Sequence, residues 1–247
     1  MPMPMYNYDN AINILHDTYW VGFYDESADL HCNPYLLIDH GDVILFDPGS
    51  IPHFPIVFRK VLDVVNPNEI TAICLSHQDP DVAGNIAVVE DVIDHDDLKI
   101  VTHSSNVRMI KHYGAKSNFY EVDKHDHKLV LASGRILEFV YTPYLHSPFT
   151  IITYDTKNRT LFSGDLFGAI SREWDLFSKV DSFASIDAWH KFIIPNNQIL
   201  KNCLGKLEKR KIDRILPQHG SVIQGDDVTK TIEHLKNLPC GADLLKD

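Results

Sequence analysis

The fold of this chain is decided by the segment Ser76-His77-Gln78-Asp79-Pro80-Asp81. It follows residues 70–75, a short apolar run that is typical of a buried strand. Its histidine and two aspartates are spaced by two residues, so an extended backbone aims all three side chains the same way. Pro80 favours an extended conformation at Asp79. The alternative interpretation is a polar loop in which Asp81 is the N-cap of the helix that follows.

Three further segments place a histidine or an aspartate at the end of an expected strand, beside glycine or proline. They are Tyr144-Leu145-His146-Ser147-Pro148, Leu161-Phe162-Ser163-Gly164-Asp165 and Leu216-Pro217-Gln218-His219-Gly220. A chain bends readily at glycine, which has no Cβ, and can present a neighbouring side chain there. A lone histidine is more often a satisfied surface or core residue. Four such segments in this order predict a shared metal site instead.

Strands and helices are expected in both halves of the chain. The strands are predicted at 20–24, 35–39, 43–46, 70–75, 98–102, 128–131, 136–142, 149–154, 159–163 and 214–216. The helices are predicted at 55–65, 82–93, 104–113, 186–207 with an interruption near Pro195, and 226–235. This pattern favours two mixed β-sheets face to face with helices outside them. Since no low-complexity linker divides the chain, residues 1–247 are expected to form a single domain.

The order of these motifs resembles the metallo-β-lactamase superfamily, whose fold is a four-layer αββα sandwich of the α/β (α+β) class. More specifically, it resembles the diiron domain of flavodiiron proteins. That family has H-x-E-x-D-H where the hydrolases of the superfamily have H-x-H-x-D-H, and here the carboxylate of Asp79 holds the discriminating position. Other segments that resemble the family are Asn33-Pro34-Tyr35-Leu36, Asp47-Pro48-Gly49, Leu145-His146-Ser147-Pro148 and the run from Leu161 to Gly168.

The resemblance implies a dinuclear centre with six protein ligands. One metal takes His77, Asp79 and His146, the other takes Asp81 and His219, and Asp165 bridges them. Two Fe(II) ions, three carboxylates and a hydroxide together make a neutral site, which a low-dielectric pocket favours. The oxygen-rich, thiolate-free ligand set suits iron or manganese, although zinc binds more tightly and can occupy a purified sample. Two iron ions are the expected cofactor.

Two departures from the flavodiiron pattern shape the functional hypothesis. Val82 stands where the family has a second histidine, which implies an open coordination position. No flavodoxin domain and no Gly-rich flavin-phosphate loop follow the diiron domain, so we expect no flavin in this chain. This combination is similar to stand-alone oxygen-binding diiron proteins. It implies a non-haem diiron protein that binds or reduces dioxygen, or another small molecule, in an oxygen-sensing or redox role.

Alternatives to that hypothesis remain open at this stage. The main one is a dinuclear metallohydrolase acting on a phosphodiester or thioester, because a metal-bound hydroxide is a ready nucleophile. Another is a scaffold with an inactive site. Under the first hypothesis, an external electron donor or a signalling protein is the expected partner. The flavodiiron resemblance implies a homodimer.

Composition excludes other classes of protein. The formal net charge of −11 disfavours nucleic-acid binding. No stretch reaches the roughly 20 apolar residues of a membrane span, so no membrane association is expected. The N-terminal residues do not resemble a signal peptide, and four scattered cysteines suit reduced thiols. We therefore expect a cytoplasmic protein. The motif His125-Asp126-His127 and His95 are interpreted as solvated loops.

Overall fold

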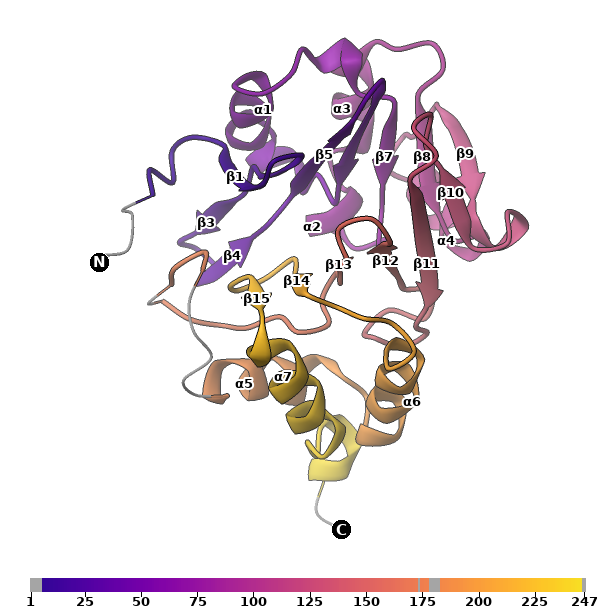
Figure 1. Ribbon diagram of the computed structural model, residues 1–247. Coiled ribbons are helices and arrows are strands. Elements are labelled where there is room, and N and C mark those ends of the chain that lie inside the picture. Colours follow the sequence, from indigo (N-terminus) through magenta and orange to yellow (C-terminus); the bar gives the residue numbers. More distant parts are fainter. Residues whose placement is uncertain (1–5, 173, 178–182, 246–247) are drawn as a thin grey trace.

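The computed structural model describes residues 6–172, 174–177 and 183–245 (Figure 1). Within these residues, a seven-stranded sheet has the order β1-β2-β5-β6-β7-β8-β9 and a six-stranded sheet has the order β10 to β15, beside a β3-β4 hairpin. The strands of the first sheet are β1 (Ile12–Leu15), β2 (Thr18–Trp20), β5 (Tyr35–Asp39), β6 (Asp42–Phe46), β7 (Ala72–Cys74), β8 (Lys99–Thr102) and β9 (Asn118–Glu121). The second sheet contains β10 (Lys128–Val130), β11 (Ile136–Tyr141), β12 (Ile151–Asp155), β13 (Thr160–Phe162), β14 (Arg214–Leu216) and β15 (Ile223–Gln224). The hairpin consists of β3 (Phe23–Asp25) and β4 (Leu30–Cys32).

Helices cover the outer face of each sheet (Figure 1). Those of the first half are α1 (Phe54–Leu62), α2 (Pro80–Ala83), α3 (Ile86–Ile93) and α4 (Ser104–Lys111). Those of the second half are α5 (Ala184–Ile193), α6 (Asn197–Leu207) and α7 (Asp226–Lys236). Short 3-10 turns lie at η1 (Ile51–His53), η2 (Pro67–Glu69), η3 (Val122–Lys124) and η4 (Gly241–Leu244).

Alternating side chains along the strands point into different hydrophobic cores, one outside each sheet and one between the two sheets. In β5, Leu36 packs in the core with the residues of α1 and α3, whereas Leu37 packs between the two sheets. In β13, Leu161 packs with the residues of α6 and α7, and Phe162 faces the first sheet. The ring of Phe162 stacks on that of Phe46 with centroids 3.9 Å apart. Successive strand residues point to opposite faces, so this pattern confirms the predicted αββα sandwich.

Two expected elements are wrong in detail. The helix predicted over 82–93 is divided into α2 and α3. Asn85 lies between the two helices, and its Nδ2 donates to the carbonyl oxygen of Pro48 at 2.9 Å. The strand predicted over 20–24 is divided between β2 and β3. The break lies at Gly22, where an added Cβ would be 2.3 Å from the carbonyl oxygen of Cys32. The expected interruption near Pro195 is confirmed, because α5 and α6 are separate helices.

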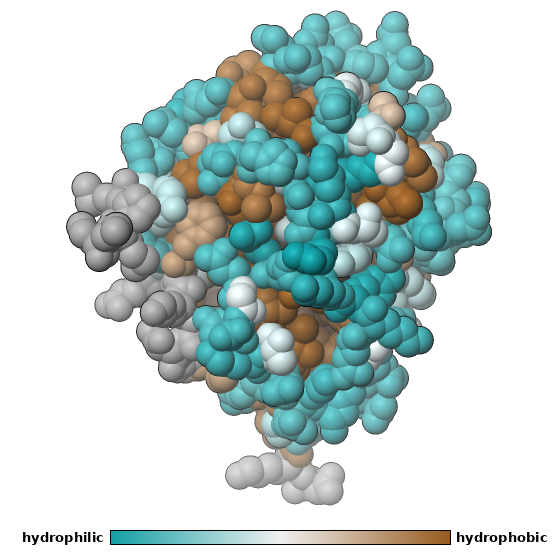
Figure 2. Space-filling model, viewed as in Figure 1, coloured by the Kyte–Doolittle hydropathy of each residue, from teal (hydrophilic) through white to brown (hydrophobic). Residues whose placement is uncertain are grey.

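The surface is mixed in character. On the face drawn in Figure 2, hydrophilic residues surround several smaller hydrophobic patches. Among the described residues, no helix has the length and apolar character that crossing a membrane requires. The four cysteines are all free and buried.

Candidate metal centre

Five of the six predicted ligands lie on loops and the sixth, Asp81, lies in the first turn of α2; all six meet where the two sheets face each other. Strands β6 and β7 are parallel neighbours in the first sheet, as are β13 and β14 in the second. His77 and Asp79 follow β7, Asp165 follows β13, and His219 follows β14. His146 lies on the loop between β11 and β12. Parallel neighbouring strands have their carboxyl ends at the same end of a sheet, which explains why residues so distant in sequence converge.

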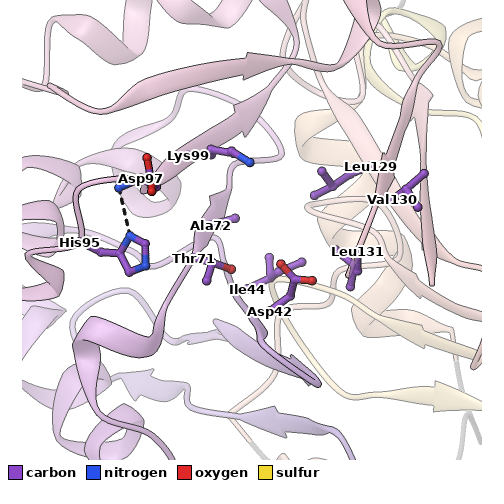
Figure 3. A pocket seen from close by; sticks show the side chains of 10 residues that line it. All are labelled: Asp42, Ile44, Thr71, Ala72, His95, Asp97, Lys99, Leu129, Val130 and Leu131. Carbon is purple, nitrogen blue, oxygen red and sulfur yellow. Dashed lines mark hydrogen bonds between the residues drawn. The ribbon is translucent and has the colours of Figure 1, made fainter. Parts of the chain in front are cut away.

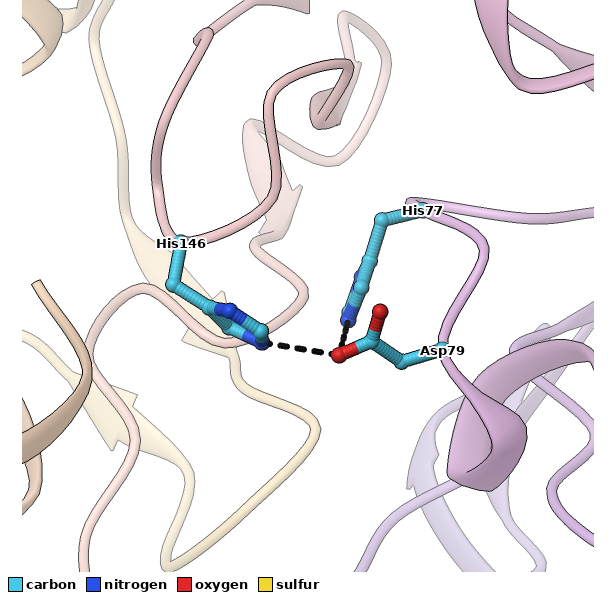
Figure 4. A group of neighbouring side chains, drawn as sticks. All are labelled: His77, Asp79 and His146. Atoms are coloured by element: carbon cyan, nitrogen blue, oxygen red, sulfur yellow. Dashed lines mark ion pairs between the residues drawn. The ribbon is translucent and has the colours of Figure 1, made fainter. Parts of the chain in front are cut away.

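Three of the predicted ligands form a compact group, drawn in Figure 4. His146 Nε2 lies 3.1 Å from Asp79 Oδ2, and His77 Nε2 lies 3.7 Å from the same oxygen. One ligand atom from each of the three side chains lies within 4.8 Å of the others. The Asp79 carboxylate points between the two imidazoles (Figure 4). Such a convergence of two imidazoles and a carboxylate is suited to one metal ion.

Asp165 stands between this group and the remaining two residues. Its Oδ2 lies 2.9 Å from His146 Nε2 and 3.8 Å from His77 Nε2. Its Oδ1 lies 3.6 Å from His219 Nε2. His219 Nε2 in turn lies 3.3 Å from Asp81 Oδ2. The structure thus brings all six residues together and orients the two oxygens of Asp165 toward different histidines.

Several buried polar atoms of this cluster have no hydrogen-bond partner among the described residues. They are His77 Nε2, His219 Nε2 and Asp165 Oδ1. Buried polar atoms are nearly always satisfied, so these atoms are suited to coordinate a metal ion. The other ring nitrogens are engaged, since His77 Nδ1 lies 2.9 Å from Ser76 Oγ and His219 Nδ1 donates to the His31 carbonyl oxygen at 2.9 Å. Metal-binding histidines are held in this way, and the residues present fit a metal pair.

The electrostatics of the cluster favour added positive charge. Burial alone lowers the pKa of His146, but Asp165 and Asp79 raise it to about 10. Burial likewise disfavours the charged form of His219, yet Asp81 and Asp165 hold its pKa well above the usual range. Burial raises the pKa of Asp165, and His77, His146 and His219 lower it below the usual range. The carboxylates therefore stay anionic and favour positive charge beside them, either on protonated histidines or on metal ions.

The loop of Asp165 is held by contacts that the sequence did not reveal. An added Cβ at Gly164, whose φ is +53°, would lie 3.1 Å from the side chain of Ser76. From α5, Trp189 Nε1 donates to the carbonyl oxygen of Asp165 at 2.9 Å, and His190 Nε2 accepts from the Phe167 amide at 3.1 Å. In sequence, Trp189 and His190 belong to an ordinary amphipathic helix, so no local signal assigns them this role.

Gln78 links the two loops that carry His77 and His146. Its Nε2 donates to Asp79 Oδ1 at 2.9 Å, and its Oε1 accepts from Ser147 Oγ at 2.7 Å. The sequence contained a usable signal, because Gln78 stands between two candidate ligands. Gln78 therefore orients both the carboxylate and the His146 loop.

The loop of His219 is clamped by Asn33. The Asn33 side chain donates to the carbonyl oxygens of Pro217 and Gly220 at 3.0 and 2.7 Å. The backbone amide of Asn33 donates to the carbonyl oxygen of Gln218 at 2.7 Å. The Asn33 motif was noted in the sequence, and its contacts with this loop come from the structure.

Other local expectations are corrected or confirmed here. The backbone is extended at Asp79, as predicted, but Asp81 lies in the first turn of α2 and Asp79 is the N-cap. Asp81 reaches His219 from the helix rather than from an extended strand. Val82 is fully buried in the core of the first sheet. Tyr144, two residues before His146, is 51% exposed.

Asp47, in the Asp47-Pro48-Gly49 turn after β6, hydrogen-bonds to the start of the loop that carries His77. Its Oδ1 accepts from the amide of Ser76 at 2.8 Å. Burial raises its pKa to about 6, because this stabilising hydrogen bond only partly offsets desolvation. Asp47 therefore positions the start of the His77 loop.

A separate cavity of about 210 Å³ lies at the opposite ends of the strands (Figure 3). It is lined by the starts of β6, β7 and β8, and by β10. His95 is one of its lining residues, and its Nδ1 accepts from the amide of Asp97 at 3.1 Å. His125 and Asp126 are exposed, as expected of a solvated loop.

The chain is similar to proteins of a known family. Residues 30–220 match the sequence model described as ODP family beta lactamase. The chain belongs to the ODP family. Its structure is similar to the apo state of the chemotaxis sensor ODP from T. denticola, with 27% identity, 95% of this chain and 96% of that chain covered, and a TM-score of 0.80. The peroxy diiron species of chemotaxis sensor ODP gives 25% identity, 94% and 97% coverage, and a TM-score of 0.78.

Other similar proteins match this chain over only part of their own length. The flavodiiron protein from Giardia intestinalis is 21% identical, with 95% of this chain and 60% of that chain covered and a TM-score of 0.82. An uncharacterized protein from Methanocaldococcus jannaschii is 26% identical over 239 residues, which cover 90% of this chain and 59% of that protein. The chain thus spans less than two thirds of the length of these curated relatives.

Proposed function

We propose that this protein binds two iron ions and that dioxygen binds at the iron pair. The proposed ligands are His77, Asp79 and His146 for one ion and Asp81 and His219 for the other, with Asp165 between them. This ligand division is the one that the sequence implied.

One observation carries the proposal. Asp165 directs Oδ2 toward His146 at 2.9 Å and Oδ1 toward His219 at 3.6 Å. A carboxylate whose oxygens face two separate histidine groups is placed to bridge two metal ions. The unpartnered Nε2 atoms of His77 and His219 support the same interpretation.

The relatives support iron and dioxygen. One of the similar structures is the peroxy diiron species of a chemotaxis sensor, and another is a flavodiiron protein. The donor set of imidazoles and carboxylates, without thiolate, suits iron by ligand type. Bound iron would supply the electrons and the open coordination position that dioxygen needs. The residues of this chain hold the ions, orient the imidazoles through Ser76 and the His31 carbonyl, and compensate their charge.

The test is anaerobic reconstitution with Fe(II), followed by metal analysis and by Mössbauer and optical spectroscopy before and after exposure to O2. Two iron ions per chain and an optical change on aeration are expected. A chain that binds iron but shows an unchanged spectrum in air contradicts the proposal. Turnover of a model phosphodiester by the iron or manganese form, abolished by Asp81→Ala, would favour the metallohydrolase alternative instead.

The partners and location belong to the same proposal. A signalling partner is supported by the relation to a chemotaxis sensor, and an external electron donor is the redox alternative. A homodimer is tested by sedimentation of the iron-loaded protein. Four free, buried cysteines support a reducing, cytoplasmic compartment.

A further inference from the structure

A cavity with an aromatic wall lies between α1, β2 and the β3-β4 hairpin. Its volume is about 400 Å³, which is within the size range of small-molecule sites. The aromatic wall consists of the rings of Tyr8, Trp20, Tyr24, His31 and Trp174. None of the six proposed metal ligands is among the residues that line the cavity. The protein therefore has a second place, apart from the metal centre, where a small molecule can bind.

The rings of the aromatic wall hold one another in place. Trp174 stacks on His31 with centroids 4.2 Å apart, and Tyr24 stacks on His31 at 4.5 Å. The centroids of Tyr8 and Trp20 lie 5.0 and 5.7 Å from that of Trp174. Trp20 is 1% exposed whereas Tyr24 is 36% exposed, so the wall extends from the interior to solvent. Because aromatic rings pack favourably against one another, a flat ring is the shape that this wall suits.

Lys60 brings a buried positive charge to the cavity. It is 1% exposed, and its Nζ lies 4.3 Å from the centroid of the Trp20 ring. Nζ donates to the carbonyl oxygens of Tyr8, at 2.6 Å, and of Gly22. An ammonium group has three donors, so one of them remains for a ligand.

The charge of Lys60 lacks a direct counter-ion among the described residues. Burial, with a smaller contribution from Arg59, lowers the pKa of Lys60 to about 8, although Asp9 and Asp63 favour the charged form. The amine is therefore still mostly protonated at pH 7. A buried charge is costly unless an opposite charge pairs with it, so an anion in the cavity would be stabilised.

Two buried ring nitrogens of the aromatic wall also lack partners. His31 Nδ1 and Trp174 Nε1 have no hydrogen-bond partner among the described residues. The indole nitrogen can only donate, and a neutral imidazole nitrogen can donate or accept. A carboxylate has about four lone-pair sites, so it can accept from a ring nitrogen and from an ammonium group together. The polar atoms of the cavity thus suit an anionic acceptor.

We propose that this cavity binds a small aromatic carboxylate. Its ring packs against the aromatic wall, and its carboxylate pairs with Lys60 Nζ. The proposal does not rest on the proposed function, because none of the residues that carry it is a proposed metal ligand.

Benzoate is the probe, and its affinity is measured by equilibrium dialysis of the iron-loaded protein, kept anaerobic at pH 7. Saturable binding of one benzoate per chain is expected. Benzamide has nearly the same shape without the charge, and it should compete at least about tenfold more weakly. Cyclohexanecarboxylate keeps the charge without the flat ring, and it should bind about two- to tenfold more weakly than benzoate.

Substitutions then locate the bound benzoate. Lys60→Met removes the charge and should weaken binding at least about tenfold. Trp174→Leu removes one ring of the wall at a half-buried position and should weaken binding about two- to tenfold. It serves as the test if Lys60→Met does not fold. Lys111→Met is the matched control, because the exposed Lys111 also lies over a ring, that of Phe119 at 5.7 Å, and does not line the cavity.

A carboxylate could also bind at the metal centre, and Asp165→Asn distinguishes the two places. Benzoate affinity that is unchanged in Asp165→Asn and Lys111→Met but lower in Lys60→Met and Trp174→Leu supports the cavity. Binding that is lost in Asp165→Asn and kept in Lys60→Met places benzoate at the metal centre and overturns the proposal. The absence of saturable binding, or benzamide competing as well as benzoate, overturns it too.

Discussion

Asp165 Oδ2 lies 2.9 Å from His146 Nε2, and both residues belong to the second sheet and its loops. Asp79, which His146 also approaches at 3.1 Å, belongs to the first sheet. The candidate metal centre therefore joins the two halves of the sandwich. Because metal binding to the folded state alone is linked to folding, occupancy of this centre should stabilise the whole chain.

Asp165→Asn should reduce the bound iron to one ion or fewer per chain. The asparagine side chain is neutral and has one oxygen instead of two. It therefore cannot bridge two cations through the positions that the unpartnered Oδ1 and the Oδ2 of Asp165 occupy. Metal analysis after anaerobic reconstitution measures the effect. Asp63→Asn, at an exposed position after α1, is the control and should bind as much iron as the unmodified protein. Equal iron content in the Asp165 variant would show that this carboxylate is not a ligand.

Gln78→Leu should weaken metal binding without removing a ligand. The change deletes the bonds to Asp79 and Ser147 at 2.9 and 2.7 Å. Loss of a residue that orients a ligand typically costs about 10- to 100-fold in metal affinity. Competition with a chelator measures the affinity. The exposed Gln198, whose side chain hydrogen-bonds to Asn202 in the same helix, is the matched position, and Gln198→Leu should leave the affinity unchanged.

His190 should make the fold sensitive to mild acid. Its side chain is fully buried, and burial lowers its pKa to about 4, whereas an unfolded histidine titrates near 6.5. Protonation therefore favours the unfolded chain. Above about pH 6.5 His190 does not lower the free energy of unfolding. That free energy declines as the pH falls toward about 4, by about 3 kcal/mol at most from this group.

The comparison of His190→Gln with the unmodified protein isolates this effect. Urea unfolding between about pH 7.5 and about pH 5 should show a larger loss of stability in the unmodified protein, since glutamine does not titrate. Other titrating groups, including those of the metal centre, act equally in both proteins. Parallel stability curves over that range would exclude a role for His190.

The sequence predicted the layers because they follow from local pattern, and it singled out the six candidate residues because they stand near strand ends in an order that resembles the flavodiiron domain. Apolar runs define the buried strands, and Asp165 and His219 follow two of them directly. The contacts of His190 and Trp189 were not predictable, since they depend on how α5 packs against a loop about 24 residues away. The break after α2 was missed because the apolar stripe continues across Gly84 and the competing hydrogen bond of Asn85 is made to a distant residue.

Arg135 should be a main determinant of stability, because its guanidinium joins the two sheets. It is buried, and it lies 2.8 Å from Asp17, between β1 and β2, and within hydrogen-bond distance of Asp155 in β12. Arg135→Ala leaves these carboxylates buried without their cation, which should cost about 3–5 kcal/mol in the free energy of unfolding. Arg159→Ala removes an exposed pair with Asp213 and should cost less than about 1 kcal/mol. Urea titration at neutral pH measures both, and similar losses in the two variants would refute the assignment.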